Sequence, residues 1–512
     1  MKSIITVSLL VFSLMAYSQQ PTIAWQKCIG GTAGEYGWSL KELGDGNLIG
    51  CGYTDSNDGD FSGNHGNDDA VVYKLSPDGT VLWTKLYGGT EDEEATDIEI
   101  TNDGGFIFTG TTYSNDGDVS GNHGDNDIWV VKTDASGNVS WQKCFGGSYD
   151  ERGETIIQTS DGGYIFLGSA YSTDGDVSGI HGNSYTDIWA VKINSSGTIE
   201  WQKCFGGNDA EEGYSVAEAA NGDFIIAGYT SSNDGDVSGN NGGRDSWVLR
   251  VSSSGSIIWQ KCLGGANTEE FNSIYLNNDG TIMTLGYSNS SSGDLAGAGG
   301  HGDDDFWVVK LGSDGTKIFS KCYGGPYADQ ANKMAKTYDG NYVLCGLATA
   351  NGGDISGLHS SALGPDIWVT KINPDGLLLW QKCLGGYNQD EGLFITATAD
   401  GNCIASGFTY SGGGDVSGLH GNKDIWLVKL SGGASSTDEN IISNFTVFPN
   451  PATNKIYFDK KLSDIVVYDP SGRIVESLFN SEVTELDISF LKPGIYFLFV
   501  NKLSVVKFSK GL

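Results

Sequence analysis

The sequence contains a unit of about sixty residues that is repeated seven times. Each copy opens on an aromatic residue, which a short strand-like segment and a Gly-Gly pair follow. One such unit cannot bury its own apolar face, so a regular repeat of this length predicts a stacked or circular array. The seven opening residues are Trp25, Trp83, Trp141, Trp201, Trp259, Phe319 and Trp380.

Residues 1–18 have the features of a signal peptide. Lys2 gives a positive start, residues 4–15 form an apolar run, and Ala16 to Ser18 offer a small-residue cleavage site. The apolar run is too short to cross a bilayer, and no later segment is apolar enough to do so. We therefore predict a mature chain that is exported and soluble, with no transmembrane segment.

Acidic residues far outnumber basic residues, and the formal net charge is −34 at pH 7. Nucleic acids are bound through phosphate contacts with Lys and Arg, so this balance argues against a nucleic-acid partner. It favours solubility and the binding of cations. The 76 glycines suit a turn-rich all-β fold, for which the 13 tryptophans and many Val and Ile residues supply a core.

The nine cysteines predict buried free thiols rather than a disulfide framework, although the chain is exported. Six share one repeat position, and equivalent positions in a ring lie farther apart than the ~7 Å that a disulfide allows between Cα atoms. The second repeat has Leu86 there, so the position is apolar. The six are Cys28, Cys144, Cys204, Cys262, Cys322 and Cys383.

Each repeat contains four segments that predict strands. In the third repeat these segments are 141–145, 154–159, 164–167 and 187–192. Asp-Gly and Ser-Gly pairs between such segments favour hairpin turns, because they accept the positive φ that these turns need. Seven units of four antiparallel strands predict an all-β fold, a seven-bladed β-propeller of four-stranded blades over residues 19–431.

The strand order also predicts how the ring closes. The first repeat begins with a lone strand, residues 25–28, and the last ends near Lys429 without its fourth strand. We expect these strands to pair, which hides sheet edges that otherwise aggregate. The tight hairpins then lie on one face, and the Gly-Gly loops and long Asp/Gly loops on the other. The strand after each Gly-Gly loop is expected to be innermost, around a central channel.

The repeat pattern, Trp…Gly-Gly…Asp-Gly-Asn…Gly-x-Thr, resembles bacterial β-propeller repeats over about residues 25–430. This resemblance implies the fold and no single activity, because one fold hosts many functions. A function has to be argued from particular residues.

The C-terminal part has a different pattern. Residues 432–443 predict a Gly/Ser-rich linker, and residues 444–512 alternate apolar strands with turns, which predicts a small β-sandwich. Its spaced motifs are Val447 to Pro451, Ile465 to Asp469, Gly472-Arg473, Leu486 to Ser489, Gly494 to Leu498 and Lys507-Phe508. In this order they resemble the type IX secretion C-terminal sorting domain of Bacteroidetes. The resemblance implies that the type IX machinery exports the protein, which is then released or attached to the outer cell surface.

A carboxylate follows each Gly-Gly pair by four residues. If the next strand is innermost, these acids ring the channel mouth and predict a site for a cationic ligand. The alternative is structural, in which each acid accepts hydrogen bonds from backbone N–H groups of a turn. The seven acids are Glu35, Glu93, Glu151, Glu211, Glu269, Asp329 and Asp390.

The long loops carry the spacing of a calcium loop, with oxygen ligands at positions 1, 3, 5 and 12 and Gly at position 6. Only the first four repeats keep the first Asp, and the last acid of the third, Asp187, is displaced by two residues. The alternative is a turn whose carboxylate caps backbone amides. The candidate calcium ligands are Asp58, Asp60, Ser62, Asp69, Asp116, Asp118, Ser120, Asp127, Asp174, Asp176, Ser178, Asp187, Asp234, Asp236, Ser238 and Asp245.

All six histidines fall in these same loops, and Asn241 takes the place of His in the fourth. Calcium prefers oxygen ligands, and Asn replaces His poorly as a ligand of a transition metal. A structural hydrogen-bond network of His and Asp is therefore favoured. The histidines are His65, His123, His181, His301, His359 and His420.

A single ligand site should appear as departures from the repeat. Near the expected channel mouth these are Trp38, Arg152 and Tyr214, and the loops add Tyr149, Tyr327 and Tyr387. Aromatic residues beside carboxylates suit the binding of carbohydrate or peptide.

We therefore expect a binding module for extracellular polysaccharide or protein rather than an enzyme. No Ser-His-Asp or zinc motif stands out, and the repeat accounts for every histidine. The alternative is a secreted polysaccharide-degrading hydrolase or lyase, because two carboxyl groups suffice to hydrolyse a glycoside. A purely structural surface protein is a third possibility.

Overall fold

The computed structural model describes residues 20–182, 184–359, 364–431, 447–448, 452–462, 465–468, 474–478, 483–492, 494–500 and 504–510. The predicted signal peptide (1–18) and linker (432–443) lie outside these residues. The chain divides into two compact units, Met1–Ala434 and Ser435–Leu512. The described residues form strands throughout, apart from one short 3₁₀ helix, η1 (Gly293–Leu295). No helix in them is long and apolar enough to cross a membrane.

The described part of the first unit forms seven four-stranded antiparallel sheets. Six sheets use consecutive strands: β2 to β5 (Glu35–Glu42, Leu48–Thr54, Asp69–Leu75, Val81–Tyr87), β6 to β9 (Glu93–Ile100, Phe106–Thr112, Asp127–Thr133, Val139–Phe145), β10 to β13 (Glu151–Gln158, Tyr164–Ala170, Asp187–Ile193, Ile199–Phe205), β14 to β17 (Glu211–Glu218, Phe224–Thr230, Asp245–Val251, Ile257–Leu263), β18 to β21 (Glu269–Leu276, Ile282–Ser288, Asp305–Leu311, Lys317–Tyr323) and β22 to β25 (Gln330–Lys336, Tyr342–Ala348, Asp366–Ile372, Leu378–Leu384). The seventh joins β26 (Asp390–Ala397), β27 (Cys403–Thr409) and β28 (Asp424–Ser431) to β1 (Thr22–Ile29).

The seventh sheet joins the two ends of this unit. Strand β1 pairs antiparallel with β28, and Gln26 lies opposite Val428 in the register. This pairing confirms the predicted closure by the lone N-terminal strand. It also covers the edge of β28, which would otherwise present unpaired backbone groups.

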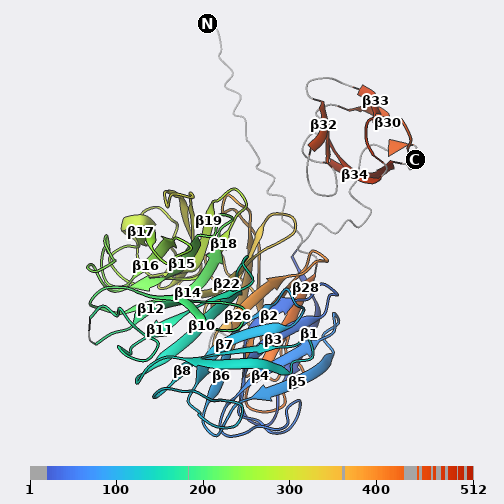
Figure 1. Ribbon diagram of the computed structural model, residues 1–512. Coiled ribbons are helices and arrows are strands. Elements are labelled where there is room, and N and C mark those ends of the chain that lie inside the picture. Colours follow the sequence, from blue (N-terminus) through green and yellow to red (C-terminus); the bar gives the residue numbers. More distant parts are fainter. Residues whose placement is uncertain are drawn as a thin grey trace. The chain divides into compact units, whose positions relative to one another are not determined.

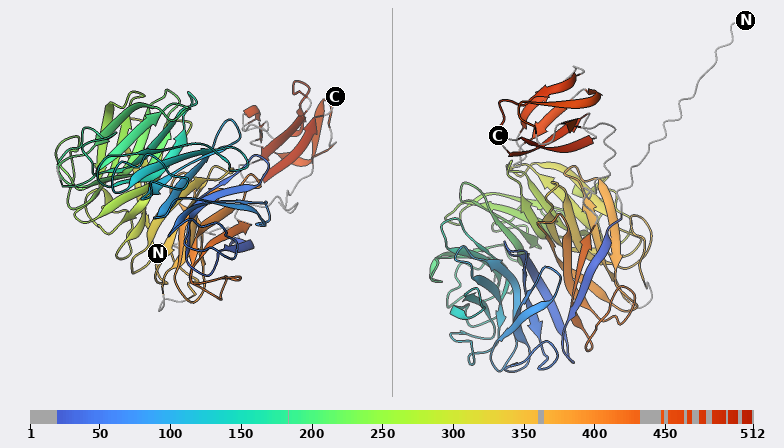
Figure 2. Two further views of the ribbon diagram at one scale, coloured as in Figure 1. Left: turned by 60° about the horizontal axis from the view of Figure 1, so that its bottom comes forward. Right: turned by 90° about the vertical axis from the view of Figure 1, so that its right-hand side faces the viewer.

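The strand after each Gly-Gly loop, which is the first strand of its sheet, lies on the inside of the ring, and β2, β10, β14, β22 and β26 are seen near its centre in Figure 1. Around the ring, β2 contacts β6, and each following first strand contacts the next until β26 meets β2 again. The expectation that the strand after each Gly-Gly loop is innermost is therefore confirmed. The sheets fan outward from this inner ring, as a second direction of view also shows (Figure 2).

Local sequence explains the turns and the tilt of the inner strands. Gly162, in the Asp161-Gly162 hairpin, has φ of 86°, a conformation that glycine adopts at little cost. The inner strand β10 has a β-bulge between Gly153 and Thr155. Bulges bend a strand and increase its twist, as a closed ring requires.

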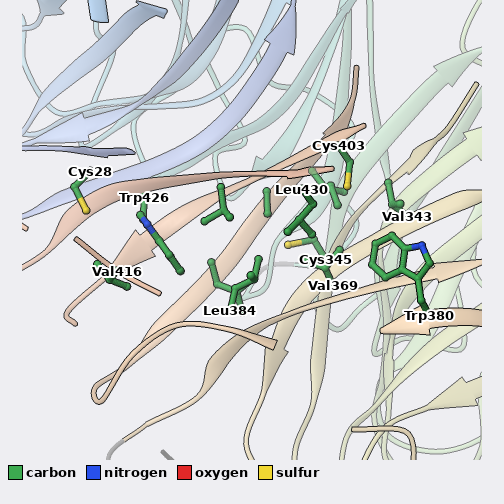
Figure 3. Close-up of a cluster of buried hydrophobic side chains, with 14 residues drawn as sticks. Cys28, Val343, Cys345, Val369, Trp380, Leu384, Cys403, Val416, Trp426 and Leu430 are labelled. Atoms are coloured by element: carbon green, nitrogen blue, oxygen red, sulfur yellow. The ribbon is translucent and has the colours of Figure 1, made fainter. Parts of the chain in front are cut away.

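Large apolar side chains fill the space between neighbouring sheets. Six tryptophans are fully buried there: Trp129, Trp189, Trp247, Trp307, Trp368 and Trp426. In the cluster of Figure 3, Trp426 and Leu430 of the last sheet pack with Cys345 and Val369 of the sheet before it. The nine cysteines are free thiols, and burial raises the pKa of Cys28 to about 12.

The described part of the second unit contains two sheets. One joins β29 (Val447–Phe448), β30 (Lys455–Leu462) and β33 (Val483–Asp487), and the other joins β32 (Ile474–Leu478), β31 (Ile465–Tyr468), β34 (Gly494–Val500) and β35 (Ser504–Lys510). One apolar cluster draws on both sheets, with Ile456 of β30, Ile465 of β31 and Leu498 of β34 among its members. This unit therefore has a core of its own.

Candidate functional site

Two kinds of loop leave the ring of sheets on the same side, which we name the loop face. Examples are residues 88–92, which join β5 of the first sheet to β6 of the second, and residues 113–126, which join β7 to β8 within the second sheet. The tight hairpins, such as residues 101–105, lie at the other ends of the strands. The loop face holds most of the residues that the repeat pattern singled out.

The seven repeated acids are buried and bind the backbone of their own loops. The Oε2 atom of Glu93 accepts a hydrogen bond from the Gly89 N–H at 2.6 Å, and its Oε1 accepts one from the Thr112 hydroxyl at 2.7 Å. The second Gly of every Gly-Gly pair donates to its acid in the same way. Burial raises the pKa of Asp329 to about 7 and that of Asp390 to about 6.

This geometry favours the structural role of the acids over a ligand site. None of the seven is more than 1 % exposed, so a ligand in the channel does not reach them. They are Glu35, Glu93, Glu151, Glu211, Glu269, Asp329 and Asp390.

The first Asp of each predicted calcium loop caps the neighbouring Gly-Gly loop. One oxygen of Asp116 accepts from the Thr90 N–H and the other from the Thr90 hydroxyl, both at 2.9 Å. The equivalent pairs are Asp58 with Thr32, Asp174 with Ser148 and Asp234 with Asn208. These are the contacts that the turn-capping alternative expects.

The other predicted ligands of the second loop also have protein partners. Asp118 accepts a hydrogen bond from the Gly88 N–H at 3.4 Å, and the Ser120 hydroxyl accepts one from the Gln142 amide at 2.6 Å. Among the described residues, no group of three or more His, Cys, Asp or Glu side chains is arranged to hold a metal ion. Calcium in these loops stays a prediction. The remaining predicted ligands occupy equivalent positions: Asp60, Ser62, Asp69, Asp176, Ser178, Asp187, Asp236, Ser238 and Asp245.

The histidines form the predicted hydrogen-bond network with aspartates. The Nδ1 atom of His123 lies 2.6 Å from Oδ2 of Asp127, and Asn241 makes a longer contact of 3.2 Å with Asp245. Some histidines also reach the next sheet, as His359 does with Nε2 at 3.4 Å from Asp415. The histidines therefore tie each long loop to its own sheet and, in places, to its neighbour.

A central cavity of about 360 Å³ lies among the innermost strands. It brings together Trp38 and Tyr214, which stood out as departures from the repeat, whereas Arg152 is exposed on β10 and outside the lining. Every one of the seven inner strands contributes to the wall. The lining residues are Trp38, Thr96, Asp97, Glu154, Glu212, Tyr214, Glu270, Asn272, Asn332, Lys333, Leu393 and Phe394.

Two carboxyl groups of the cavity have opposite electrostatic surroundings. Burial raises the pKa of Asp97, but Lys41 and Lys333 outweigh it and hold that pKa below its usual value. For Glu154 the nearby cations, Arg152 and Lys333, do not outweigh burial. Burial, followed by the charges of Glu94 and Glu212, raises the pKa of Glu154 to about 8.

Exposed tyrosines concentrate on the loop face. Tyr149, Tyr327 and Tyr387, in Gly-Gly loops, are 53 %, 61 % and 61 % exposed. Tyr149 meets Tyr171 edge to face, with ring centroids 5.9 Å apart. Among the exposed tyrosines of the described ring, Tyr338 alone lies in a hairpin of the opposite face. The others on the loop face are Tyr113, Tyr171, Tyr185 and Tyr410.

The loop tyrosines could be predicted from the sequence, whereas most of the cavity residues could not. Tyr149, Tyr327 and Tyr387 stood out as departures from the repeat. Glu154 and Lys333 lie within strands of different repeats, and only the closed ring brings them together. The signal that could have found them is the variation at that strand position between repeats.

The chain is similar to one curated protein at low identity. The Caulobacter vibrioides regulatory protein FlaEY is 24 % identical over 335 residues, which are 62 % of this chain and 33 % of that protein. The chain thus spans about a third of the length of this curated relative.

Among solved structures, Kuenenia stuttgartiensis hydrazine synthase has a TM-score of 0.44 at 10 % identity, covering 72 % of this chain and 92 % of that one. The WD40 domain of Neurospora crassa Pan2 has a TM-score of 0.41 at 10 % identity, with 78 % and 95 % covered. These scores are too low to bear on activity.

The comparison is more specific for the C-terminal unit. Residues 446–510 match the model of the secretion system C-terminal sorting domain. This match agrees with the motifs seen in the sequence and implies an interaction with the type IX secretion machinery. The chain is thus an all-β, propeller-like protein with a type IX sorting domain, exported to the cell surface or the extracellular space.

Proposed function

We propose that this protein is a seven-bladed β-propeller, residues 19–431, which binds extracellular polysaccharide through its loop face. A linker (432–443) joins it to a small β-sandwich (444–512) that serves export. A protein ligand at the same face is the second outcome that the test below distinguishes.

The observation that carries the proposal is the one-sided distribution of exposed tyrosines. Seven of the eight exposed tyrosines in the described ring lie on the loop face. Tyrosine offers a flat apolar ring with a polar hydroxyl, which suits contact with sugar rings and their hydroxyl groups. Buried acids hold the Gly-Gly loops that carry Tyr149, Tyr327 and Tyr387, since the N–H groups of Gly147, Gly325 and Gly386 donate to Glu151, Asp329 and Asp390.

The test measures retention of the purified chain on a panel of insoluble polysaccharides and immobilised extracellular proteins. The informative variant replaces Tyr149, Tyr327 and Tyr387 by alanine together, and Tyr338→Ala is the matched control on the opposite face. We expect the triple variant to lose about tenfold or more in affinity for a retained polysaccharide, and the control to bind as the parent does.

Retention on immobilised proteins but on no polysaccharide would show that the ligand of this face is a protein. Equal binding by the parent and the triple variant would show that the loop face is not the binding site. The same panel is assayed for released sugar, because product release would assign the protein to the alternative class, a polysaccharide-degrading enzyme.

A further inference from the structure

The central cavity carries an excess of negative charge on walls that are partly aromatic. Four carboxyl groups and one ammonium group line it, together with three aromatic rings. Its volume of about 360 Å³ suits a small ligand or the end of a larger one. The cavity is formed by the inner strands and is separate from the exposed loop tyrosines.

Three of the four carboxyl groups have protein partners. Glu212 accepts a hydrogen bond from the Tyr214 hydroxyl at 2.6 Å, and Glu270 lies 2.8 Å from the Arg244 guanidinium. Asp97 accepts hydrogen bonds from the hydroxyls of Ser39 and Thr155 at 2.8 and 2.9 Å. The acids are therefore not a uniform cluster, since cations act on Asp97 and Glu270 whereas Glu212 has a neutral hydroxyl donor.

Glu154 is the exception. Among the described residues it has no hydrogen-bond or ion-pair partner. The carboxyl groups of Glu94 and Glu212 act against its charge, and the cations of Arg152 and Lys333 offset them only in part. Glu154 is half-buried, and a carboxylate without a partner in such a place is costly, so this position favours either a proton or a bound cation.

The same cavity shows how an ammonium group is accommodated. The Nζ atoms of Lys333 and Lys41 lie 5.1 and 5.5 Å from the centre of the Phe394 ring, and both charges favour the ionised form of Asp97. Lys333, the ammonium group that lines the cavity, thus has the favourable charge of Asp97 and the ring of Phe394, whereas Lys41 also forms an ion pair with Glu99 at 3.1 Å. Such cation–π contacts gain strength where water is excluded.

Glu154, Trp38 and Tyr214 offer the same combination of carboxylate and aromatic ring in this cavity. We propose that the central cavity binds an organic ammonium group, such as that of an amino sugar, with Glu154 as its counterion and Trp38 and Tyr214 as aromatic contacts.

A metal ion fits the geometry less well. An ion such as calcium needs several oxygen ligands about 2.3–2.6 Å away. In the part of the chain that the structure describes, no three acidic, His or Cys side chains converge on one point in this way. An ammonium group is larger and accepts dispersed partners, including the faces of aromatic rings.

The test is calorimetric titration of the purified chain with glucosamine, at constant ionic strength and pH 7. N-acetylglucosamine is the neutral counterpart of this probe, and calcium chloride tests the metal. The informative variant is Glu154→Gln, which removes the charge and keeps the shape. Glu91→Gln, in an exposed Gly-Gly loop outside the cavity lining, is the matched control.

We expect glucosamine to bind the parent and Glu91→Gln alike, N-acetylglucosamine to bind at least tenfold more weakly, and Glu154→Gln to lose about tenfold in affinity for glucosamine. Equal affinities for the amine and its acetylated form would overturn the proposal, as would unchanged binding by Glu154→Gln. If calcium binds and prevents glucosamine from binding, the cavity is a metal site and the proposal is wrong. The loop-face variants leave this titration unchanged, so either proposal can fail alone.

Discussion

The indole of Trp129 is buried between two sheets, yet its N–H group has a partner. It donates to the amide oxygen of Gln142 at 2.8 Å, and the amide nitrogen of Gln142 donates to the Ser120 hydroxyl at 2.6 Å. This chain of bonds links a core side chain, a neighbouring strand and a long loop. The same pair recurs as Trp189 with Gln202, Trp247 with Gln260, Trp368 with Gln381 and Trp426 with Gln26.

At this scale we predict that Gln142→Leu destabilises the protein by about 1–3 kcal/mol, because the buried Trp129 N–H loses its acceptor. Chemical denaturation of the parent and the variant measures the change in free energy of unfolding. In Trp129→Phe the N–H is absent, so the same Gln142 substitution should cost markedly less there. Equal costs in both backgrounds would contradict the role given to this hydrogen bond.

The sequence contains a sign of this tryptophan–glutamine pair, because the first sheet differs from the others at both positions. The first sheet lacks the tryptophan, with Val71 in its place, and it also lacks the glutamine, with Thr84 in its place. In the fifth sheet, which keeps Trp307, the Ser320 hydroxyl takes the place of the glutamine and accepts the indole N–H at 2.9 Å, so every tryptophan at this position keeps an acceptor. The tryptophan was expected to serve in packing and Ser120 to bind calcium, since residues far apart in a repeat give no direct sign of contact.

At the scale of the elements, strand β1 closes the ring by pairing with β28, and a substitution in it tests this role. Gln26→Pro removes a backbone donor in the strand that pairs with β28, so we expect a lower melting temperature and the formation of oligomers through the freed edge. Thermal unfolding and sedimentation measure both effects. Gln26→Leu, which loses only the side-chain bonds, should lower the melting temperature but stay monomeric to the same extent as the parent. A monomeric Gln26→Pro variant with parental stability would show that closure does not depend on this strand.

The long loops allow a direct test of calcium against turn capping. Both oxygens of Asp116 already accept hydrogen bonds from Thr90, so we expect Asp116→Ala to lower the melting temperature equally in EDTA and in millimolar calcium. The measurement is thermal unfolding in both buffers. A rise of several degrees on adding calcium to the parent, lost in the variant, would establish the loops as calcium sites.

The presence of each strand could be predicted from the sequence more accurately than the residue at which it begins. The second strand of the third repeat was expected at residues 154–159, but β10 spans Glu151–Gln158 and therefore includes the acid itself. Gly153 and the bulge beside it interrupt the alternation of apolar residues. The first paired residues of this strand, from Glu151, could therefore not be recognised from the sequence pattern. The fourth strand, expected at 187–192, is Asp187–Ile193, because its apolar run is unbroken.

For the whole molecule, buried acids set the dependence of stability on pH. Asp329 and Asp390 have an ordinary pKa of 3.8, which burial raises to about 7 and about 6 in the fold. The folded state then binds protons more readily than the unfolded state, so stability is full below about pH 4 and falls as pH rises through 6 to 7. Thermal unfolding at constant ionic strength should give a higher melting temperature at pH 5 than at pH 8. A melting temperature that rises from pH 5 to pH 8 would contradict this assignment.

A few exposed acids act in the opposite direction at lower pH. Hydrogen bonds from Thr101 and the nearby Lys132 lower the pKa of Asp103 to about 2. Its contribution is present above about pH 4 and is lost as pH falls toward 2. Stability is therefore expected to decline again in strong acid.

The central cavity shows the limit of prediction from this sequence. The repeat predicted a ring with an inner strand in each unit, and it drew attention to Trp38 and Tyr214. It could not predict that Glu154 stays without a partner while Asp97 gains two lysines, because these contacts join different repeats across the ring. The repeat predicts closure of the ring, but it does not predict which side chains of different repeats meet at its centre.

The most direct test of the loop face as the binding surface is hydroxyl-radical footprinting with and without a polysaccharide that the chain retains. Oxidation at each tyrosine is read by mass spectrometry. The account predicts protection of Tyr149, Tyr327 and Tyr387 in the complex and unchanged oxidation of Tyr338 on the opposite face. Protection of Tyr338, with the three loop tyrosines as reactive as in the free protein, would contradict it.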